Sequence, residues 1–251
     1  MERNDAPIAY RADRAVATIT LDDPARRNAL STRMLDRLRE AIARAVADEA
    51  IRTIVIDHAG PVFCAGADLT ESAGADSAED LPAVRLAEAL ADMCEAPKPV
   101  VALVRGPARG GGMGLLAAAD VTLCESETVM AFSEVRLGVV PAVIGPVVAR
   151  RLSPGKMRQL FITGDPFTAE QALDWGLVDG ADTAGAFDDL IESLRRGGPL
   201  AQAGVKALTA TPDLRERLRE AAALTAEYFF SDEGREGVRS FIEKRSPSWV
   251  D

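Results

Sequence analysis

Hydrophobic and polar residues in the first part of the chain follow two periods in turn. Residues 15–21 alternate in polarity and are rich in β-branched side chains, which predicts a half-buried strand. From Ser31, a candidate N-cap, apolar residues recur on one face of a helix to about residue 50. The apolar run over residues 51–57 predicts a buried strand, and strand, helix and strand in this order indicate a parallel crossover unit.

The same alternation continues through the middle of the chain. The expected elements are a helix over 82–94, a strand over 100–104, a short apolar helix ending near 120 and a strand over 121–124. Residues 71–80 are small and acidic and predict a mobile loop. Further along, Ser153-Pro154 and the capping box at Thr168 and Gln171 each predict the start of a helix.

The pattern changes after about residue 197, where no strand-like run remains. Helices rich in alanine, arginine and glutamate are expected near 200–210, 213–230 and 234–244. The sequence therefore predicts a mixed α/β core over residues 1–196, followed by a helical region over residues 197–251.

Composition indicates a folded protein and limits its partners. Of the 251 residues, 47% are hydrophobic and 27% are charged, which is enough for a sizeable core. The 39 acidic and 29 basic residues give a net charge of −10, which argues against a nucleic-acid partner because such binding neutralises phosphates. An anionic small ligand is compatible with this charge, since a few arginines or helix N-termini can make the local field positive.

Cysteine and histidine usage narrows the chemistry further. Cys64, Cys94 and Cys124 lie far apart in apolar surroundings, which is typical of a reduced, cytoplasmic protein. His58 is the only histidine, so multi-histidine metal sites and Ser-His-Asp triads lack their residues, and we expect no metal. Because His58 ends an apolar strand, we expect a structural role for it.

No membrane association is expected. The N-terminal residues carry no apolar segment after their charges. The most apolar stretch, residues 99–124, is interrupted by Arg105, Arg109 and Asp120. The sequence therefore predicts neither a signal peptide nor a membrane span.

Two glycine-bearing loops, each expected after a buried strand, are the most informative feature. The first covers residues 63–68, and the second contains Gly110, Gly111 and Gly112. Glycines let a ligand approach the main chain closely, and the start of a helix leaves N–H groups free to bind negative oxygen. Two such groups from separate loops could form an oxyanion hole; the alternative is a pair of tight turns, and spacing alone favours neither.

A dinucleotide-binding loop is the main rival interpretation of these glycines. Gly112, Gly114 and Ala117 fit the loose phosphate-binding pattern. That pattern should directly follow the first strand of a βαβ unit, yet here it lies mid-chain and several residues after the nearest predicted strand. The chain also contains neither a P-loop motif nor a G-x-S-x-G motif.

Glu134 is the outstanding acidic residue. Apolar residues lie on both sides of it in the segment 130–138. A poorly hydrated carboxyl has a raised pKa, as a proton carrier at neutral pH requires. The alternative is a surface glutamate paired with Arg136, and the pattern alone does not separate the two.

Six segments combine into a familiar pattern. They are RNAL at 27–30, FCAGADL at 63–69, KPVVALVRGPARGGG at 98–112, FSEVRLGVVP at 132–141, LTAEYFF at 224–230 and SFIEKR at 240–245. In this order, and over nearly the whole chain, they resemble the enoyl-CoA hydratase/isomerase, or crotonase, superfamily. The resemblance implies a spiral core of ββα units with a C-terminal helical region for trimer contacts, in a homotrimer or a dimer of trimers. It also implies an acyl-CoA thioester as substrate, with coenzyme A as part of that substrate and no separate cofactor.

Site residues follow from the same resemblance. The thioester carbonyl is expected to bind the amides of Ala67 and Gly111, beside the carboxyl of Glu134. The residues implied in coenzyme A binding are Ala65, Asp68 and Leu69 on the adenine side, Arg26 or Arg27 near the phosphates or pantetheine, and Phe241 and Lys244 from a neighbouring subunit. We expect the walls of the acyl pocket to come from residues 71–84 and 139–148.

One departure from the family pattern bears on the reaction. Typical hydratases carry a first glutamate at the position of Gly114, so only Glu134 remains here. Single-glutamate members include Δ3,Δ2-enoyl-CoA isomerases and bacterial 3-methylglutaconyl-CoA-hydratase-like proteins. The leading prediction is hydration of a 2-enoyl-CoA through an enolate; the alternatives are isomerisation of a 3-enoyl-CoA and acyl-CoA binding without turnover.

Overall fold

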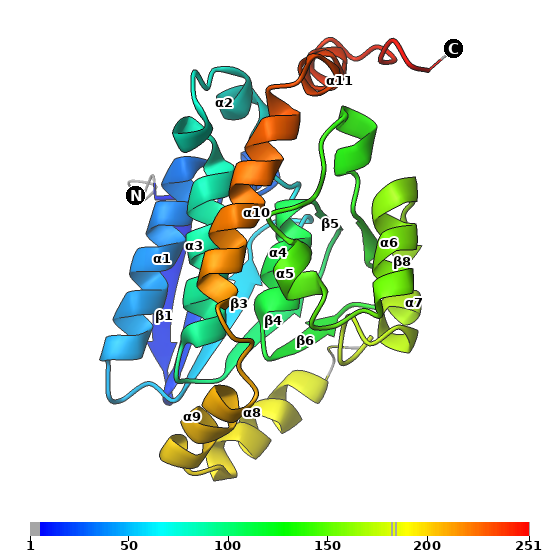
Figure 1. Cartoon of the computed structure of the whole chain (residues 1–251). Helices are drawn as coiled ribbons and strands as arrows, with labels where there is room; N and C mark the ends of the chain where they lie inside the picture. Colours follow the sequence, from blue (N-terminus) through cyan, green and yellow to red (C-terminus); the bar gives the residue numbers. More distant parts are fainter. Residues whose placement is uncertain (1–5, 182, 184, 251) are drawn as a thin grey trace.

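A computed structural model of the chain describes residues 6–181, 183 and 185–250 (Figure 1). Its main sheet has five strands in the order β1-β2-β3-β4-β6. β1 is antiparallel to β2, and all other neighbours are parallel. The strands are β1 (Ile8–Asp13), β2 (Val16–Leu21), β3 (Thr53–His58), β4 (Val100–Val104) and β6 (Val121–Cys124).

Three long helices lie side by side and cover one face of this sheet (Figure 1). They are α1 (Thr32–Ala47), α3 (Pro82–Glu95) and α10 (Leu214–Phe229). The buried side chains of α1 recur at helical spacing, at Met34, Leu35, Leu38 and Ile42. Because α10 comes from the C-terminal part of the chain, this layer joins the predicted helical region to the core.

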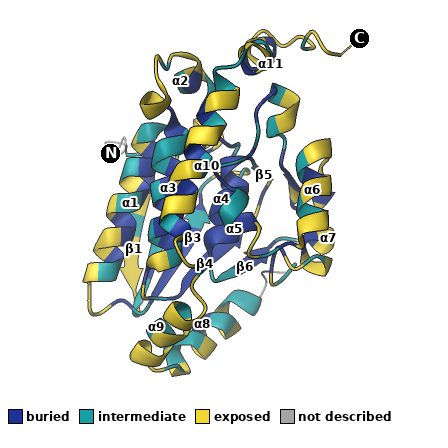
Figure 2. Ribbon diagram, viewed as in Figure 1, coloured by how far each residue is buried: buried dark blue, intermediate teal, exposed yellow. Residues whose placement is uncertain are grey.

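Shorter helices surround the sheet, and the most buried of them, α4, lies at the centre of the molecule with the strands (Figure 2). The α-helices are α2 (Leu69–Ala73), α4 (Gly111–Ala118), α5 (Gly145–Val148), α6 (Pro154–Thr163), α7 (Ala169–Asp174), α8 (Ala186–Arg196), α9 (Pro199–Leu208) and α11 (Asp232–Ile242). The 3-10 turns are η1 (Pro24–Arg26), η2 (Ala78–Asp80) and η3 (Glu134–Leu137).

A small second sheet brings two distant segments together. It contains β5 (Ala108–Arg109), β7 (Val129–Ala131) and β8 (Phe167–Thr168), in the order β5-β7-β8. β5 is parallel to β7, so Arg109 lies beside Ala131. Gly110 N also donates a hydrogen bond to Ala131 O at 3.4 Å. The glycine triplet therefore lies next to the segment that leads into Glu134.

Most elements agree with the sequence predictions. β4 and β6 occupy the predicted residues, and Ser31 caps α1 by accepting a hydrogen bond from Met34 N at 3.1 Å. The cap at Ser153 and the capping box at Thr168 are also confirmed. The C-terminal helices α9, α10 and α11 begin and end within two residues of their predicted bounds. The division of the chain at residue 196 stays a prediction.

Besides the very short strands β5, β7 and β8 and the helix α5, which the sequence does not predict, three longer segments differ from the predictions. The sequence does not predict β1, an edge strand whose residues after Ile8 are mostly exposed and do not alternate. Residues 71–80, predicted as a mobile loop, instead contain the end of α2 and the turn η2, where Ser77 N donates to Asp80 Oδ2 at 3.1 Å. Helix α8 is also absent from the predictions.

The described residues include no helix that is both long and apolar enough to cross a membrane. Residues 1–5, part of the segment in which we expect no signal peptide, lie outside the described residues. In the same described part of the chain, no group of three or more His, Cys, Asp or Glu side chains is placed to hold a metal ion.

Candidate active site

The two predicted glycine-bearing loops meet in space. Arg109 N donates to Cys64 O at 2.9 Å, and Cys64 and Ala108 form a parallel β-bridge. Gly66, with a φ of +98°, packs so closely that an added Cβ would lie 3.4 Å from Arg109 O. Leu30 N donates to Gly66 O at 2.8 Å and fixes the loop from its other side. The first loop is therefore held against the segment that opens α4.

The amides of Ala67 and Gly111 are available to a ligand. Asp68 N, next to Ala67, is already used, because it donates to Leu30 O at 3.3 Å. Gly111 is the first residue of α4, so its amide has no helical partner one turn earlier. Within the described residues, neither Ala67 N nor Gly111 N donates a hydrogen bond. Two unpaired donors from separate loops thus lie in one region, as an oxyanion hole requires.

The glycine triplet is needed for packing as well as for close approach. Gly110 has a φ of +49°, which is costly for a residue with a Cβ. A Cβ added at Gly111 would lie 2.8 Å from Leu30 Cδ1 and 3.0 Å from Leu86 Cδ2. The loop is therefore a tight turn that also leaves an amide free, and the two interpretations of the glycines are compatible.

The carboxyl of Glu134 lies against Gly110, where an added Cβ would be 3.4 Å from Oε1. Its Oε2 is enclosed and has no hydrogen-bond partner among the described residues. Burial raises the pKa of Glu134 to about 7, against a smaller, opposite effect of its own backbone amide. The alternative of a surface pair with Arg136 is wrong, because Arg136 Nη2 instead lies 2.6 Å from Asp165 Oδ1.

An inner cavity of about 110 Å³ lies beside these groups. Ala67, Gly111 and Glu134 all line it, so the structure brings the three predicted catalytic groups together. Both stretches predicted to wall the acyl pocket contribute, with Leu81, Pro82, Ala83, Val139, Val140, Pro141 and Val143. Helix α10 adds Thr225 and Phe229, which lie in the family-like segment 224–230 but are not predicted from the sequence to line the pocket.

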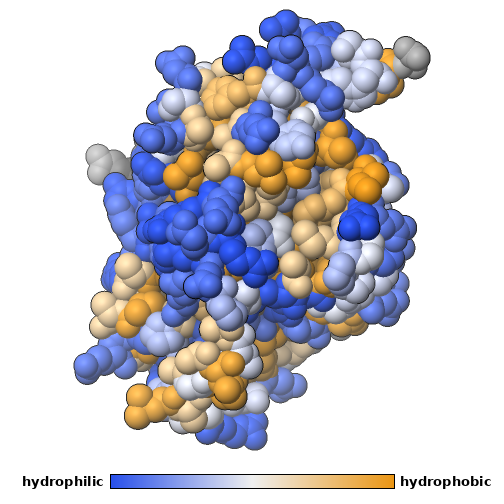
Figure 3. Space-filling model, in the orientation of Figure 1, coloured by the Kyte–Doolittle hydropathy of each residue, from blue (hydrophilic) through white to orange (hydrophobic). Residues whose placement is uncertain are grey.

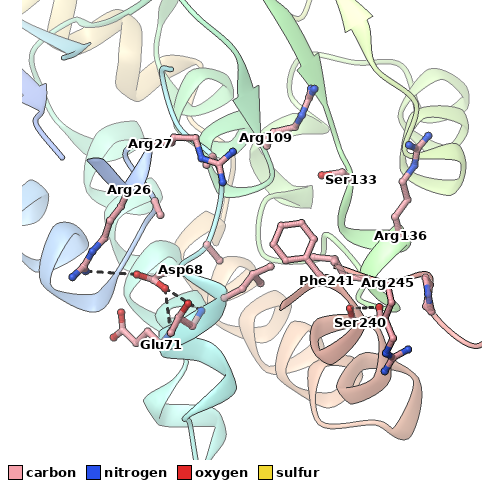
Figure 4. A pocket seen from close by; sticks show the side chains of 18 residues that line it. Arg26, Arg27, Asp68, Glu71, Arg109, Ser133, Arg136, Ser240, Phe241 and Arg245 are labelled. Carbon is pink, nitrogen blue, oxygen red and sulfur yellow. Dashed lines mark hydrogen bonds and ion pairs between the residues drawn. The ribbon is translucent and has the colours of Figure 1, made fainter. Parts of the chain in front are cut away.

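A larger outer pocket of about 1000 Å³ opens beside the inner cavity (Figure 4). The two are continuous, because they share the lining residues Ala65, Ala67, Leu69, Arg109, Ser133 and Leu137. The predicted coenzyme A contacts that line the outer pocket are Arg26, Arg27, Ala65, Asp68, Leu69 and Phe241. Lys244 is exposed and is not among the lining residues, so its role stays a prediction.

Helix α11 forms one wall of the outer pocket. It packs against α2 and η3 of the same chain. The ring of Phe241 points from α11 into the pocket (Figure 4), although 56% of the residue is exposed. Phe241 thus lines a pocket within its own chain, and its predicted contribution to a neighbouring subunit stays a prediction.

The outer pocket is positively charged in a protein of negative net charge. The arginines that line it are Arg26, Arg27, Arg109, Arg136 and Arg245, against two acids, Asp68 and Glu71. Arg26, Arg136 and Arg245 form ion pairs with acids of the chain, whereas Arg27 and Arg109 form none with the described residues. The carboxylate of Asp68 caps α2, since its Oδ1 accepts hydrogen bonds from the amides of Thr70 and Glu71. Glu71 likewise accepts a hydrogen bond from Thr32 N at 3.1 Å. Local charge therefore favours an anionic ligand.

Gly114 cannot carry a side chain without rearrangement. A Cβ added there would lie 2.6 Å from Ile144 Cγ2 and 3.3 Å from Leu90 Cδ1. Gly114 is buried and does not line the inner cavity. Ile144 thus fills the space beside Gly114, the position where the resemblance expects a first glutamate.

His58 and Cys64 support the site without facing it. His58 Nε2 accepts a hydrogen bond from Arg105 N at 3.0 Å, and its ring lies edge-on to Phe63. Burial, helped by the charge of Arg105, lowers the pKa of His58, so the ring is neutral at pH 7. Burial raises the pKa of the Cys64 thiol to about 12, which leaves it protonated and unreactive.

The geometry of the two amides, the carboxyl and the outer pocket indicates a class of reaction. Two free amides and one enclosed carboxyl with a pKa of about 7 suit a reaction in which a carbonyl oxygen gains negative charge while a proton is transferred nearby. The cationic outer pocket suits a substrate with an anionic carrier group.

Comparisons with known proteins place the chain in a family of that class. The Enoyl-CoA hydratase/isomerase family matches residues 11–251. The mitochondrial enoyl-CoA hydratase domain-containing protein 3 of Danio rerio is 32% identical, over 93% of this chain and 84% of that protein. Trans-2-decenoyl-[acyl-carrier-protein] isomerase of Streptococcus mutans is 29% identical, over 97% of both chains. The crystal structure of an enoyl-CoA hydratase from Mycobacterium avium superimposes with a TM-score of 0.88 at 36% identity, covering 98% of this chain and 100% of that one. The chain is an enzyme of the enoyl-CoA hydratase/isomerase family, with the crotonase fold.

Proposed function

We propose that this enzyme is an enoyl-CoA hydratase-type lyase, which adds water to a 2-enoyl-CoA thioester or removes it from the product. One observation carries the proposal: the enclosed carboxyl of Glu134, with an unpartnered Oε2 and a pKa of about 7, lines the same cavity as the free amides of Ala67 and Gly111. Relatives named enoyl-CoA hydratase support it.

The mechanism follows from these groups. The two amides donate to the thioester oxygen, draw electrons onto it and make C3 of the enoyl group electrophilic. Glu134, ionised, takes a proton from water as the water oxygen bonds to C3. The same carboxyl then delivers that proton to C2 as the enolate collapses to the thioester. Ser133 and Thr225 also line the inner cavity, and Thr225 Oγ1 accepts a hydrogen bond from Val143 N at 3.0 Å.

Isomerisation of a 3-enoyl-CoA is a second candidate, and one observation favours it. Ile144 fills the space beside Gly114, so the first carboxyl of the typical hydratase pair is replaced by apolar packing. A single glutamate can take a proton from C2 and return it to C4. A relative is named as a trans-2-decenoyl isomerase.

Product analysis in deuterated water separates the candidates. The protein is incubated with a 2-enoyl-CoA and, separately, with the 3-enoyl-CoA of equal length. Hydration yields a 3-hydroxyacyl-CoA that carries deuterium at C2, whereas isomerisation yields only a shifted double bond. A shifted double bond without any hydroxyl product would contradict the lyase proposal, and tight binding without turnover would favour the third alternative, an acyl-CoA-binding protein.

Glu134→Gln tests the role of the carboxyl. The variant keeps the shape of the side chain but cannot carry the proton, so turnover should fall by about 10²–10⁴-fold. Circular dichroism should show an unchanged fold. Glu127→Gln, an exposed acid before β7, is the matched control and should keep parental turnover. Activity of Glu134→Gln within about threefold of the parent would reject the role.

Assembly as a homotrimer or a dimer of trimers is part of the same proposal. Apolar side chains are exposed at the lower edge of the molecule, where α9 lies (Figure 3). Leu200 and Leu208 of this helix are 89% and 84% exposed. They belong to the C-terminal region in which the family resemblance implies trimer contacts, and burying them in a subunit interface would be favourable.

A further inference from the structure

Arg109 occupies a position that the proposed mechanism does not use. Of the described residues that line both the inner cavity and the outer pocket, it is the only charged one. It ends β5, directly before the glycine triplet that supplies the Gly111 amide. Arg109 therefore lies at the junction of the outer pocket and the inner cavity.

The guanidinium of Arg109 has no counter-ion among the described residues. Its Nη1 is enclosed and has no hydrogen-bond partner. Burial, helped by the charge of Arg136, lowers the pKa of Arg109, which means that the surroundings disfavour a positive charge. An enclosed charge without an acceptor is costly, and in a native protein such a group needs an explanation.

The acidic residues near the outer pocket do not pair with Arg109. Asp68 and Glu71 lie on the opposite side of the outer pocket from Arg109 (Figure 4). Both accept hydrogen bonds from main-chain amides, and Asp68 also lies 3.8 Å from Arg26. Arg136, which lies on the same side as Arg109, pairs with Asp165. None of these acids is therefore available to the enclosed Nη1 of Arg109.

We propose that Arg109 binds an anionic oxygen of the acyl-CoA ligand, supplied by a coenzyme A phosphate or by a carboxylate on the acyl group. The inference rests on the proposed function and extends it to the charge of the substrate. Either oxyanion accepts paired hydrogen bonds from a planar guanidinium. Position favours the acyl carboxylate, because Arg109 also lines the inner cavity, whereas Arg26 and Arg27 line the outer pocket alone.

Four matched thioesters distinguish the two sources. They are a methyl-ended 2-enoyl group and a carboxylate-ended one of equal length, each on coenzyme A and on phosphate-free pantetheine. With an acyl carboxylate, Arg109→Gln should lose about 10- to 100-fold in kcat/KM on both carboxylate-ended thioesters only. With a phosphate, it should lose as much on both coenzyme A thioesters and on neither pantetheine thioester. Arg109→Lys, which keeps the charge, should lose less in either case.

Arg37→Gln is the control for charge alone, because Arg37 is an exposed arginine of α1 that pairs with Glu40. It should keep parental kcat/KM on all four thioesters. Arg109→Gln values within about threefold of the parent on all four, or equally reduced on all four, would overturn the inference.

Stability without ligand gives an independent readout. Removing an unpaired enclosed charge should leave the thermal midpoint of Arg109→Gln equal to that of the parent or raise it. A midpoint of Arg109→Gln that is lower than that of the parent, while Arg109→Lys keeps the parental midpoint, would show that the charge of Arg109 is already stabilised without ligand, and would also overturn the inference. If the parent turns over none of the four thioesters, the proposed function fails; calorimetric binding of the same thioesters to parent and Arg109→Gln then still decides the role of Arg109.

Discussion

Burial of the Glu134 carboxyl makes the stability of the protein depend on pH. Its pKa is about 7 in the folded chain against 4.5 for an exposed glutamate, so between these values the folded state binds more protons than the unfolded state. The resulting stabilisation is complete below about pH 4.5 and is lost as the pH rises through 7. The free energy of unfolding of Glu134→Gln should therefore exceed that of the parent by more at about pH 8 than at about pH 5. Urea unfolding measures this; an equal difference at both pH values would contradict the burial of the carboxyl.

Gly114 and Ile144 form a complementary pair of residues. Because a Cβ at Gly114 would lie 2.6 Å from Ile144 Cγ2, Gly114→Ala should lower the free energy of unfolding by about 1–3 kcal/mol. The same change should cost less in an Ile144→Ala background, where Cγ2 is gone, so denaturant unfolding of the four proteins should show coupling. Gly155→Ala, where an added Cβ meets nothing within 4 Å, should be neutral or slightly stabilising. Additive effects at residues 114 and 144 would contradict the contact.

At this scale the sequence predicts some site residues and not others. The apolar neighbours of Glu134 and the two glycine loops mark these residues as candidates, but each pattern also fits a structural alternative, and only the structure separates the two. The sequence does not predict that Ile144 fills the space beside Gly114, because the two residues are 30 positions apart and meet only in the folded chain. Among the described residues, Arg109 Nη1 has no hydrogen-bond partner. This too depends on residues distant in sequence, so the local sequence does not predict it.

Helix α10 is held to α3 by a charged cluster centred on Arg215. Its two Nη atoms lie 2.6 Å from Glu88 Oε2, 2.9 Å from Asp92 Oδ1 and 2.7 Å from Glu95 Oε2. Burial lowers the pKa of Arg215, but the hydrogen bonds to Glu95 and Asp92 and the negative charges of these two acids together raise it. α10 also supplies Thr225 and Phe229 to the inner cavity, so the cluster positions one wall of the candidate acyl pocket.

Arg215→Ala should weaken this attachment. Because Arg215 is partly shielded and bonds several acids at once, we expect the free energy of unfolding to fall by about 1–2 kcal/mol, more than for an isolated surface pair. Arg217→Ala, at an exposed position of the same helix, should change it by less than about 0.5 kcal/mol. Denaturant unfolding compares the two; equal effects would show that the cluster adds nothing to the attachment of α10.

Among the elements, length decides what the sequence can predict. β4 and β6 are short apolar runs between clear breaks, and their bounds are predicted residue by residue. β5 and β8 have two residues each and β7 has three, too few for any period to be visible. Yet these strands bring Gly110 beside Ala131 and so place Glu134 at the glycine loop. The least predictable elements thus position the site.

The whole molecule combines a net charge of −10 with a pocket lined by five arginines. A negative net charge does not exclude an anionic small ligand, because the electric field at a pocket depends on the nearest side chains. The fold itself is predicted by the six family-like segments in order, whereas periodicity alone predicts only an α/β core. Assembly cannot be predicted from the elements of one chain, since the exposed apolar residues of α9 mark a surface without naming its partner.

The central claim is that the amides of Ala67 and Gly111, from loops distant in sequence, hold one thioester carbonyl beside Glu134. Isotope-edited infrared spectroscopy of an enoyl-CoA labelled with ¹³C at that carbonyl, bound to Glu134→Gln to prevent turnover, tests it most directly. Two N–H donors should polarise the carbonyl and shift its stretching band to lower frequency than in water. Saturating binding with a band at or above its frequency in water would contradict the account.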